Sequence, residues 1–271
     1  MTSTKRRKDE HIEICLRQPV GSGVATGLER VRFEHRALPE IDLDDVDLTT
    51  SLFGRTLRAP LILGAMTGGT ARARRINERL ARAAARLGIG MALGSQRAMI
   101  EHPGLAGTYA VRDAAPDLPL LLGNIGAVQL GCGLDPEAIG DAARAVGADV
   151  LAFHLNPLQE ALQPEGDTSF RGLWGLLRSA IRSVGLPCIV KEVGTGISSP
   201  TARRLARLPL AGVETGGAGG TSWALVESYR AAREPLASAA RRLAGFGVPT
   251  AESIRHCRAA FGRRVVIGSG G

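Results

Sequence analysis

The feature that most limits how this chain can fold is a regular repeat of short apolar runs. The runs begin at Leu61, Met91, Leu120, Val150, Cys188, Ala211 and Val265. The first three intervals are therefore 30, 29 and 30 residues. A strand together with the helix that carries the chain back takes about 30 residues, so this spacing predicts a series of strand–helix units.

The stretches between the apolar runs have the features of helices. In 70–87, Ile76, Leu80, Ala84 and Leu87 fall on one face, with arginines opposite. The other predicted helices cover 135–146, which opens with Asp135-Pro136, then 222–246 as one or two helices, and a segment from Pro249 through Arg258.

The predicted strands are continuously apolar, as in a parallel sheet that protein covers on both faces. Seven consecutive units favour an α/β fold, a (β/α)8 TIM barrel over 59–271, rather than a doubly wound sheet. Seven strands leave the barrel one short of closure. Either residues 1–58 hold the missing strand, or the barrel is truncated after strand seven and the chain is part of a longer protein. We favour truncation.

Residues 1–58 show no strand–helix alternation and are expected to form an N-terminal arm that packs against the barrel. The arm opens with a basic cluster, Lys5 to Lys8, and contains an acidic stretch over 40–47. A basic cluster of this kind usually belongs to a disordered, solvated tail, whereas Ile12, Cys15 and Leu16 on one helical face favour order at the beginning of the arm.

Composition narrows the class of protein further. The net charge of +8 comes from arginines scattered over helices, and 4% of residues are aromatic, so the stacking platforms of a nucleic-acid-binding protein are scarce. The four cysteines form neither a metal-binding pair nor a redox motif. The sequence contains no long apolar span and no signal-peptide pattern. We expect a soluble cytoplasmic protein with no membrane or nucleic-acid partner.

Each predicted strand is followed by residues that suit a binding site better than a core. These segments are 64–69, 94–97, 123–124, 154–160, 191–192, 215–222 and 268–271. In α/β barrels the active site lies at the carboxyl ends of the strands. The glycines of 216–220 and 268–271 allow backbone N–H groups to approach an anion, so these two segments predict a phosphate site.

Several polar side chains at the strand ends have two interpretations. Lys191, the only lysine after position 8, is predicted to face an anionic ring or oxyanion, because Glu192 beside it points to the opposite face. Glu160 is either a metal ligand or an acid that stabilises a helix N-terminus. Gln159 either orients a ligand or caps the same helix, and His154 suits a core as well as a site.

Taken together, these segments resemble the type 2 isopentenyl diphosphate isomerases, which are FMN-dependent barrels. The matching pieces are RKDEH at 7–11, FEHRALP at 33–39, AMTGG at 65–69, GSQR at 94–97, HLNPLQE at 154–160, PEGD at 164–167, VKEVG at 190–194, GAGGTSW at 217–223 and PTAES at 249–253. They occur in the family's order and span nearly the whole chain.

The resemblance implies a role for each matching residue. The residues implied to bind FMN are Ala65, Met66, Thr67, Ser95, Asn124, Lys191, Gly216, Thr221, Gly270 and Gly271. Those implied to bind substrate are Arg7, Lys8, His11, Ser95, Gln96, Arg97, His154, Asn156 and Gln159. Glu160 is implied to bind Mg²⁺, and the catalytic residues are implied to be Gln159, Lys191 and His154.

The implied reaction converts isopentenyl diphosphate to dimethylallyl diphosphate in isoprenoid biosynthesis. Reduced FMN serves as the acid/base, with NADPH or NADH as the reductant, and the family forms homo-oligomers, tetramers or octamers by analogy. The family continues past Gly271 with the rest of the phosphate loop and strand eight, so we expect weak FMN binding and an open barrel edge. Two alternatives remain: an FMN barrel oxidoreductase of the α-hydroxyacid type, and a non-catalytic truncated remnant.

Overall fold

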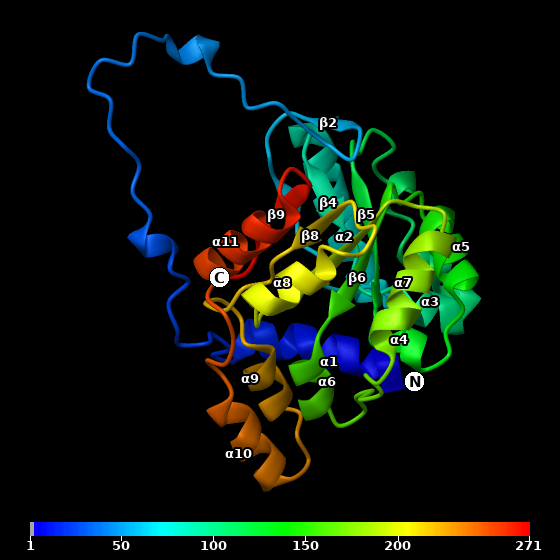
Figure 1. The fold of residues 1–271 in the computed structure, drawn as a ribbon. Helices are drawn as coiled ribbons and strands as arrows, with labels where there is room; N and C mark the ends of the chain where they lie inside the picture. The colour runs from blue at the N-terminus through cyan, green and yellow to red at the C-terminus, as the bar shows by residue number, and fades with distance from the viewer. Residues whose placement is uncertain (1–2) are drawn as a thin grey trace.

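The computed structural model describes residues 3–271, with side chains from Arg6 onward, and its centre is a parallel sheet of seven strands (Figure 1). The strands are β3 (Ile62–Leu63), β4 (Gly90–Ala92), β5 (Leu121–Gly126), β6 (Val150–Leu155), β7 (Cys188–Glu192), β8 (Gly212–Glu214) and β9 (Val265–Ile267). They lie side by side in chain order. Sequential order is that of a barrel, whereas a doubly wound sheet reverses direction at a switch point, so the α/β barrel prediction is confirmed.

The strand register places the polar residues in one row across the sheet. Gly126 of β5 is the partner of His154 in β6, and His154 is in turn the partner of Lys191 in β7. Lys191 is the partner of Glu214 in β8. Because the strands are parallel, this row runs along their carboxyl ends, where the sequence predicted a site.

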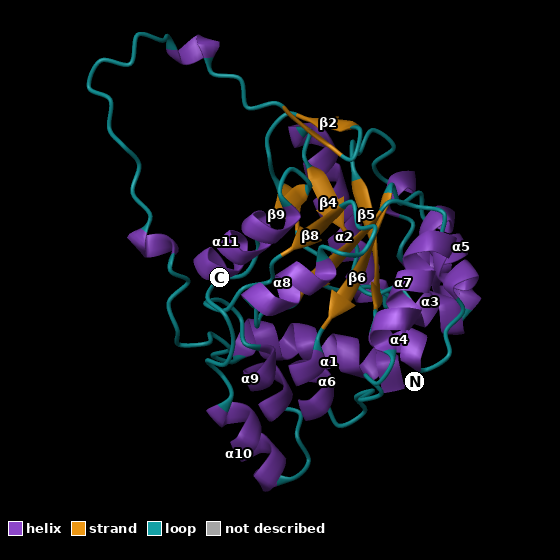
Figure 2. Cartoon of the chain, viewed as in Figure 1, coloured by secondary structure: helices purple, strands orange, loops and turns teal. Residues whose placement is uncertain are grey.

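Most of the helices lie on the outer face of the sheet, and the others lie at the carboxyl ends of its strands (Figure 2). The main ones are α2 (Ala71–Leu87), α3 (Arg97–Glu101), α4 (Val128–Gly131), α5 (Pro136–Ala145), α6 (Pro157–Leu162), α7 (Leu173–Ser183), α8 (Ser199–Leu205), α9 (Trp223–Ser228), α10 (Glu234–Arg242) and α11 (Thr250–Phe261). The helix predictions are therefore confirmed. Thr70 caps α2 by accepting from the N–H of Ala73, and Asp135 caps α5 in the same way.

The inside of the curved sheet holds a separate apolar core, which a hairpin closes at the amino ends of the strands. Small and branched side chains such as Ala92, Leu122 and Ile189 form this core, together with Leu57 of the hairpin. The hairpin consists of β1 (Thr50–Leu52) and β2 (Arg55–Leu57), which are antiparallel. Figure 1 shows it at the amino ends of the strands, opposite the polar row.

Residues 3–58 thus reach both ends of the barrel. Helix α1 (Ser3–Arg17) crosses the carboxyl ends of the strands, whereas the β1–β2 hairpin lies at their amino ends (Figure 1). Between them, Gly21 pairs with Thr221 and the Thr26 carbonyl accepts from the N–H of Ala251, and the chain then follows an exposed path over 28–49 that includes two 3-10 turns. The arm's two strands pair with each other and not with the barrel. Within residues 3–271, β3 and β9 are therefore the two edges of the sheet.

Two further expectations can be compared with the structure. None of the helices described for residues 3–271 is long and apolar enough to cross a membrane. All four cysteines are free thiols, and burial raises the pKa of Cys188 to about 12.

Candidate functional site

A cavity of about 380 Å³ lies at the carboxyl ends of the strands, where α1 also contributes to its lining. The row of His154, Lys191 and Glu214 contributes to its lining. Cofactor and substrate pockets typically occupy ~300–1,000 Å³, so the cavity is large enough for a small organic ligand.

Most residues that the sequence singled out line this one cavity. They are Arg7, Lys8, His11, Ala65, Met66, Ser95, Arg97, Asn124, His154, Asn156, Gln159, Glu160, Lys191, Gly216, Thr221, Gly270 and Gly271. They come from α1, from six strand ends and from the loop after β9. Residues separated by more than 200 positions therefore face the same space.

Two of the predicted residues, Gln96 and Thr67, are not among those that line the cavity. Gln96 is buried, donates to the carbonyl of Ala142 and accepts from the N–H of Asn124, at 3.0 Å in each case. Its side chain thus braces β5 against α5, and we leave it out of the proposed substrate contacts. The Thr67 hydroxyl is buried and lacks a hydrogen-bond partner among the described residues.

Lys8 enters the site from α1 and is almost fully buried. Its ammonium donates to the Tyr109 hydroxyl at 2.8 Å and to the Ser95 carbonyl at 3.0 Å. Burial, together with the neighbouring charge of Arg7, lowers the pKa of Lys8 to about 7, although Glu101 opposes this effect. Near neutral pH the site therefore contains a lysine that gains full charge when an anion approaches.

His154 is held as a neutral base. Its Nδ1 lies 2.8 Å from Asn124 Oδ1, and since a carbonyl oxygen accepts, the proton is on Nδ1 and Nε2 is left as an acceptor. Burial and the positive charges of Lys191, Arg7 and Lys8 lower the pKa of His154 to about 3. It therefore presents no charge to the cavity at neutral pH.

Lys191 is paired with an acid that the sequence did not single out. Its ammonium lies 3.6 Å from Glu214 Oε1 and donates to the Glu192 carbonyl oxygen at 2.8 Å. Glu214 also accepts from the hydroxyl of Ser269 at 3.0 Å. As expected, the Glu192 carboxylate does not pair with Lys191. The ion pair instead joins β7 to β8 and, through Ser269, to the loop after β9.

Glu192 shapes the loop that follows β7. Its Oε2 accepts from the backbone N–H groups of residues 193–196 at 2.5–3.0 Å, and its Oε1 accepts from the Thr195 hydroxyl at 2.6 Å. Burial raises the pKa of Glu192 and outweighs these hydrogen bonds. The carboxyl thus fixes the backbone of Val193 and Gly194, which line the cavity.

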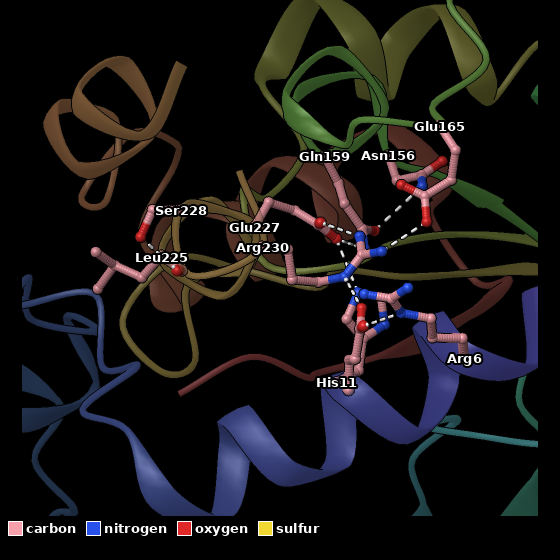
Figure 3. Close-up of polar contacts among 10 residues, drawn as sticks. Arg6, His11, Asn156, Gln159, Glu165, Leu225, Glu227, Ser228 and Arg230 are labelled. Carbon is pink, nitrogen blue, oxygen red and sulfur yellow. Dashed lines mark hydrogen bonds and ion pairs between the residues drawn. The ribbon is translucent and has the colours of Figure 1, made fainter. Parts of the chain in front are cut away.

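Gln159 has its amide oriented from both ends. Asn156 Nδ2 donates to Gln159 Oε1 at 3.2 Å, and Gln159 Nε2 donates to Glu227 Oε1 at 3.3 Å (Figure 3). Asn156 also donates to Glu160 Oε1 at 3.0 Å. The short helix α6 therefore presents Gln159 and Glu160 in fixed orientations at the edge of the cavity.

The site offers limited protein ligands for a metal. The described residues contain no group of three or more His, Cys, Asp or Glu side chains arranged around one point. Glu160 is nearly buried and lines the cavity, and its Oε2 accepts from the N–H of Asp167 at 2.8 Å. Mg²⁺ commonly binds one or two carboxylates together with substrate phosphates and water. Glu160 alone could therefore hold Mg²⁺ only together with phosphate and water ligands.

Two glycine loops meet at the side of the cavity formed by β8 and β9. A Cβ on Gly271 would lie 2.2 Å from the carbonyl carbon of Gly219, and a Cβ on Gly270 would lie 2.2 Å from the carbonyl oxygen of Gly217. Gly216 and Gly270 have φ of 48° and 104°. The N–H groups of Gly216 and Gly217 donate to Ser269, whereas those of Gly270 and Gly271, which line the cavity, have no hydrogen-bond partner among the described residues. Without a Cβ in the way these two N–H groups can approach an anion, and together with Lys191, Asn124 and the unpaired Thr67 hydroxyl they fit the phosphate and ring of FMN.

Sequence reasoning missed several residues of the site, including Tyr109, Glu214, Glu227 and Arg230. Glu227 has a fully buried side chain and Arg230 is nearly buried. Their spacing of three residues after an apolar helical turn was the available signal, because it predicts an ion pair on one helix face.

Comparison with known proteins defines the class. Residues 24–102 match the family described as FMN-dependent dehydrogenase. A crystal structure of an active chimera of (S)-mandelate dehydrogenase carrying G81A aligns with a TM-score of 0.56 at 16% identity, over 97% of this chain and 78% of that one. A mandelate oxidase structure aligns with a TM-score of 0.52 at 18% identity, over 97% and 82%. The fold is therefore that of FMN-dependent α/β barrels.

Curated relatives are much more similar in sequence. Isopentenyl-diphosphate delta-isomerase of Synechocystis is 47% identical over all of this chain and 78% of its own length. The enzymes of the same name from Cronobacter sakazakii and Rickettsia bellii are 46% and 43% identical over 98% of this chain and 77% and 78% of theirs. The chain belongs to the isopentenyl-diphosphate delta-isomerase family, in its FMN-dependent type 2 form.

Proposed function

We propose that this chain interconverts isopentenyl diphosphate and dimethylallyl diphosphate, with FMN as its cofactor. The observation that carries the proposal is that eight separate sequence segments, from 7–11 to 269–271, line a single cavity. Six of these segments overlap pieces that carry the resemblance to the isomerase family, and the relatives named isopentenyl-diphosphate delta-isomerase align over nearly the whole chain.

The diphosphate is proposed to lie beside α1. Arg7, Lys8 and Arg97 bring positive charge to the cavity, which a diphosphate needs when it leaves water. Arg97 is held by Glu101 at 2.6 Å and by Asp167 at 2.7 Å, so its position is set before the ligand arrives. His11 completes this side. Glu160 is proposed to hold Mg²⁺ against the diphosphate oxygens.

FMN is proposed to lie against the β3, β4, β5 and β8 ends. The residues that would hold it are Ala65, Met66, Thr67, Ser95, Asn124, Lys191, Gly216, Thr221, Gly270 and Gly271. When bound in its reduced form, the flavin supplies the proton donor and acceptor that a double-bond shift needs. Lys191 places a positive charge beside the negatively charged reduced ring.

The protein's own residues position the hydrocarbon and exclude water. The Gln159 amide, fixed at both ends, is proposed to lie over the reacting carbons. His154 stays neutral, so it hydrogen-bonds without attracting the diphosphate away from α1. Helix α1 covers the cavity as a lid. We propose that this part of 1–58 covers substrate and that 59–271 binds FMN.

The electron source and the assembly also remain proposals. Reduction of FMN is assigned to NADPH or NADH, and the active form to a homo-oligomer in the cytoplasm. The exposed path over 28–49 carries large apolar side chains, with Phe33 96% and Leu43 86% exposed. Such side chains are usually covered in a functional assembly, which supports association.

The test is an isomerase assay with FMN, NADPH and Mg²⁺, comparing the wild-type chain with Gln159→Ala and with Gln18→Ala. Gln18 is exposed beyond the end of α1 and serves as the matched control. We expect Gln159→Ala to lower kcat by about 100-fold, since it removes a group that positions substrate, and Gln18→Ala to change nothing. Full activity in Gln159→Ala contradicts the assignment of this residue.

Two alternatives give different results in the same samples. An α-hydroxyacid oxidoreductase needs a histidine that takes a proton from substrate, and a His154 pKa of about 3 makes it a poor base. Turnover of a hydroxyacid without response to isopentenyl diphosphate would nevertheless establish that function. A non-catalytic remnant would stay colourless after incubation with FMN.

A further inference from the structure

A single buried arginine joins three parts of the chain above the site. The side chain of Arg230 is 7% exposed and pairs with three carboxylates. Its Nε lies 3.1 Å from Glu10 Oε2, its Nη2 lies 2.6 Å from Glu165 Oε1, and its Nη1 lies 2.7 Å from Glu227 Oε2. These acids come from α1, from the loop after α6 and from α9, and Figure 3 shows Glu165 and Glu227 at the guanidinium.

Glu227 connects Arg230 to two residues of the proposed site through hydrogen bonds. Its Oε2 accepts from Arg230, so its Oε1 is left to face His11 Nε2 at 3.0 Å and Gln159 Nε2 at 3.3 Å. Its side chain is fully buried. Neither Glu227 nor Arg230 is among the residues that line the cavity. Their influence on substrate therefore acts through His11 and Gln159.

The charge state of Glu227 decides which way the Gln159 amide points. Burial alone would raise the pKa of Glu227, but His11 and Arg230 outweigh it and the pKa is lowered. While it is ionised, the carboxylate only accepts hydrogen bonds and selects the amide NH₂ of Gln159. A protonated carboxyl would donate instead and would favour the reversed amide. Among the described residues, the groups that contact Glu227 are His11, Gln159 and Arg230.

The same guanidinium holds α1 down on the barrel. Glu10 and His11 are neighbours on α1, and they contact Arg230 and Glu227 respectively. Burial works against the charge of Arg230, but Glu165, Glu227 and Glu10 raise its pKa well above the ordinary value. The arginine therefore remains a permanent cation at the junction of α1, α9 and the loop that contains Glu165.

We propose that Arg230 is a positioning residue that couples the docking of α1 to the orientation of the Gln159 amide, by holding Glu227 ionised and fixed between them. The inference rests on the proposed function for its catalytic consequence. Its structural part, the tether on α1, does not depend on that function.

The experiment uses two variants of Arg230 and a matched control, Arg233→Met. Arg230→Met keeps the length of the side chain and removes its charge. Arg230→Lys keeps the charge but lacks the guanidinium that contacts three carboxylates. Arg233 lies three residues further along, at the N-cap of α10, is exposed and has no ion pair among the described residues. Each full-length chain is measured for isomerase kcat across pH, for FMN binding by flavin fluorescence, and for hydrogen exchange of the α1 amides.

In Arg230→Met we expect kcat to fall about 100-fold, with the loss deepest at low pH because Glu227 then protonates more readily. The FMN affinity should stay unchanged, and α1 amides should exchange about tenfold faster. Arg230→Lys should give intermediate losses and a pH profile like that of the wild type. Arg233→Met should match the wild type in all three measurements.

A double-mutant cycle with Glu227→Gln tests the route of the effect. If Arg230 acts through Glu227, adding Arg230→Met to Glu227→Gln lowers kcat little further. If the two residues act independently, the fold-losses in kcat of the two single variants multiply in the double variant. Wild-type kcat and exchange in Arg230→Met, or multiplying losses in the cycle, would overturn the proposal. Should Arg230→Met fail to fold, Arg230→Lys carries the same tests. If no chain isomerises, the proposed function fails. Hydrogen exchange of the α1 amides still shows whether Arg230 holds α1 on the barrel.

Discussion

Lys8 offers a direct test of the electrostatics of the cavity. Its pKa falls from 10.5 to about 7 because it is buried and lies near Arg7, a loss of preference for the charged form on the order of 5 kcal/mol. At pH 7 about half of the molecules would carry the charge, and at pH 8 about one tenth. A bound diphosphate brings opposite charge and raises the pKa again.

The chain is well suited to a direct measurement because Lys5, Lys8 and Lys191 are its only lysines. Labelling lysine with ¹³C at Cε gives three resonances, and Lys8→Met assigns the one of interest. We expect a titration midpoint of about 7 without ligand, rising above about 8 with inorganic pyrophosphate. A Lys8 midpoint of about 10 in the free protein would refute the reasoning from burial.

The same shift makes folding stability depend on pH. The folded pKa of Lys8 lies below the unfolded value, so between about pH 7 and 10.5 the unfolded chain holds more protons and the free energy of unfolding rises with pH. Between pH 7 and pH 9 this contribution amounts to about 2 kcal/mol. Urea denaturation should show the rise in the wild-type chain relative to Lys8→Met, and equal slopes in the two chains would contradict it.

Three further predictions concern other parts of the site. In Gly68→Ala the new Cβ would lie 2.2 Å from Cε1 of the buried Tyr109, so urea denaturation should show a loss of about 1–3 kcal/mol, whereas Gly104→Ala, with open space around it, should show little change. His154, with a pKa of about 3, should show no imidazole titration between pH 5 and 8 by NMR. Glu160→Gln should raise the Mg²⁺ concentration for half-maximal isomerase activity at least about tenfold, and an unchanged requirement excludes Glu160 as the ligand.

Local pattern explains why the barrel could be predicted from the sequence. Apolar runs at 30-residue intervals indicate strands buried on both faces, and the capped amphipathic stretch over 70–87 indicates a helix. Both patterns depend on the segment itself and not on the elements that pack against it. Parallel strands in chain order then bring every carboxyl end to one edge, so His154, Lys191 and Gly216 were expected together from their position after a strand.

The hydrogen bonds and ion pairs between those residues could not be predicted from local sequence patterns. Gln96 follows a strand as its neighbours do, yet its amide turns inward to brace Asn124. The sequence excluded Glu192 as a partner for Lys191 but did not identify Glu214, because that choice depends on the register of β7 against β8. The arm over 1–58 likewise divides between the two ends of the barrel, which nothing in its composition indicates.

The sequence by itself therefore determined the order of strands and helices, the edge where the site lies and most of the residues that line it. Only the tertiary structure decided which charges pair there. Periodicity reflects the burial of each segment separately, whereas an ion pair such as Arg230 with Glu10 needs two segments, 220 positions apart, to meet at about 3 Å.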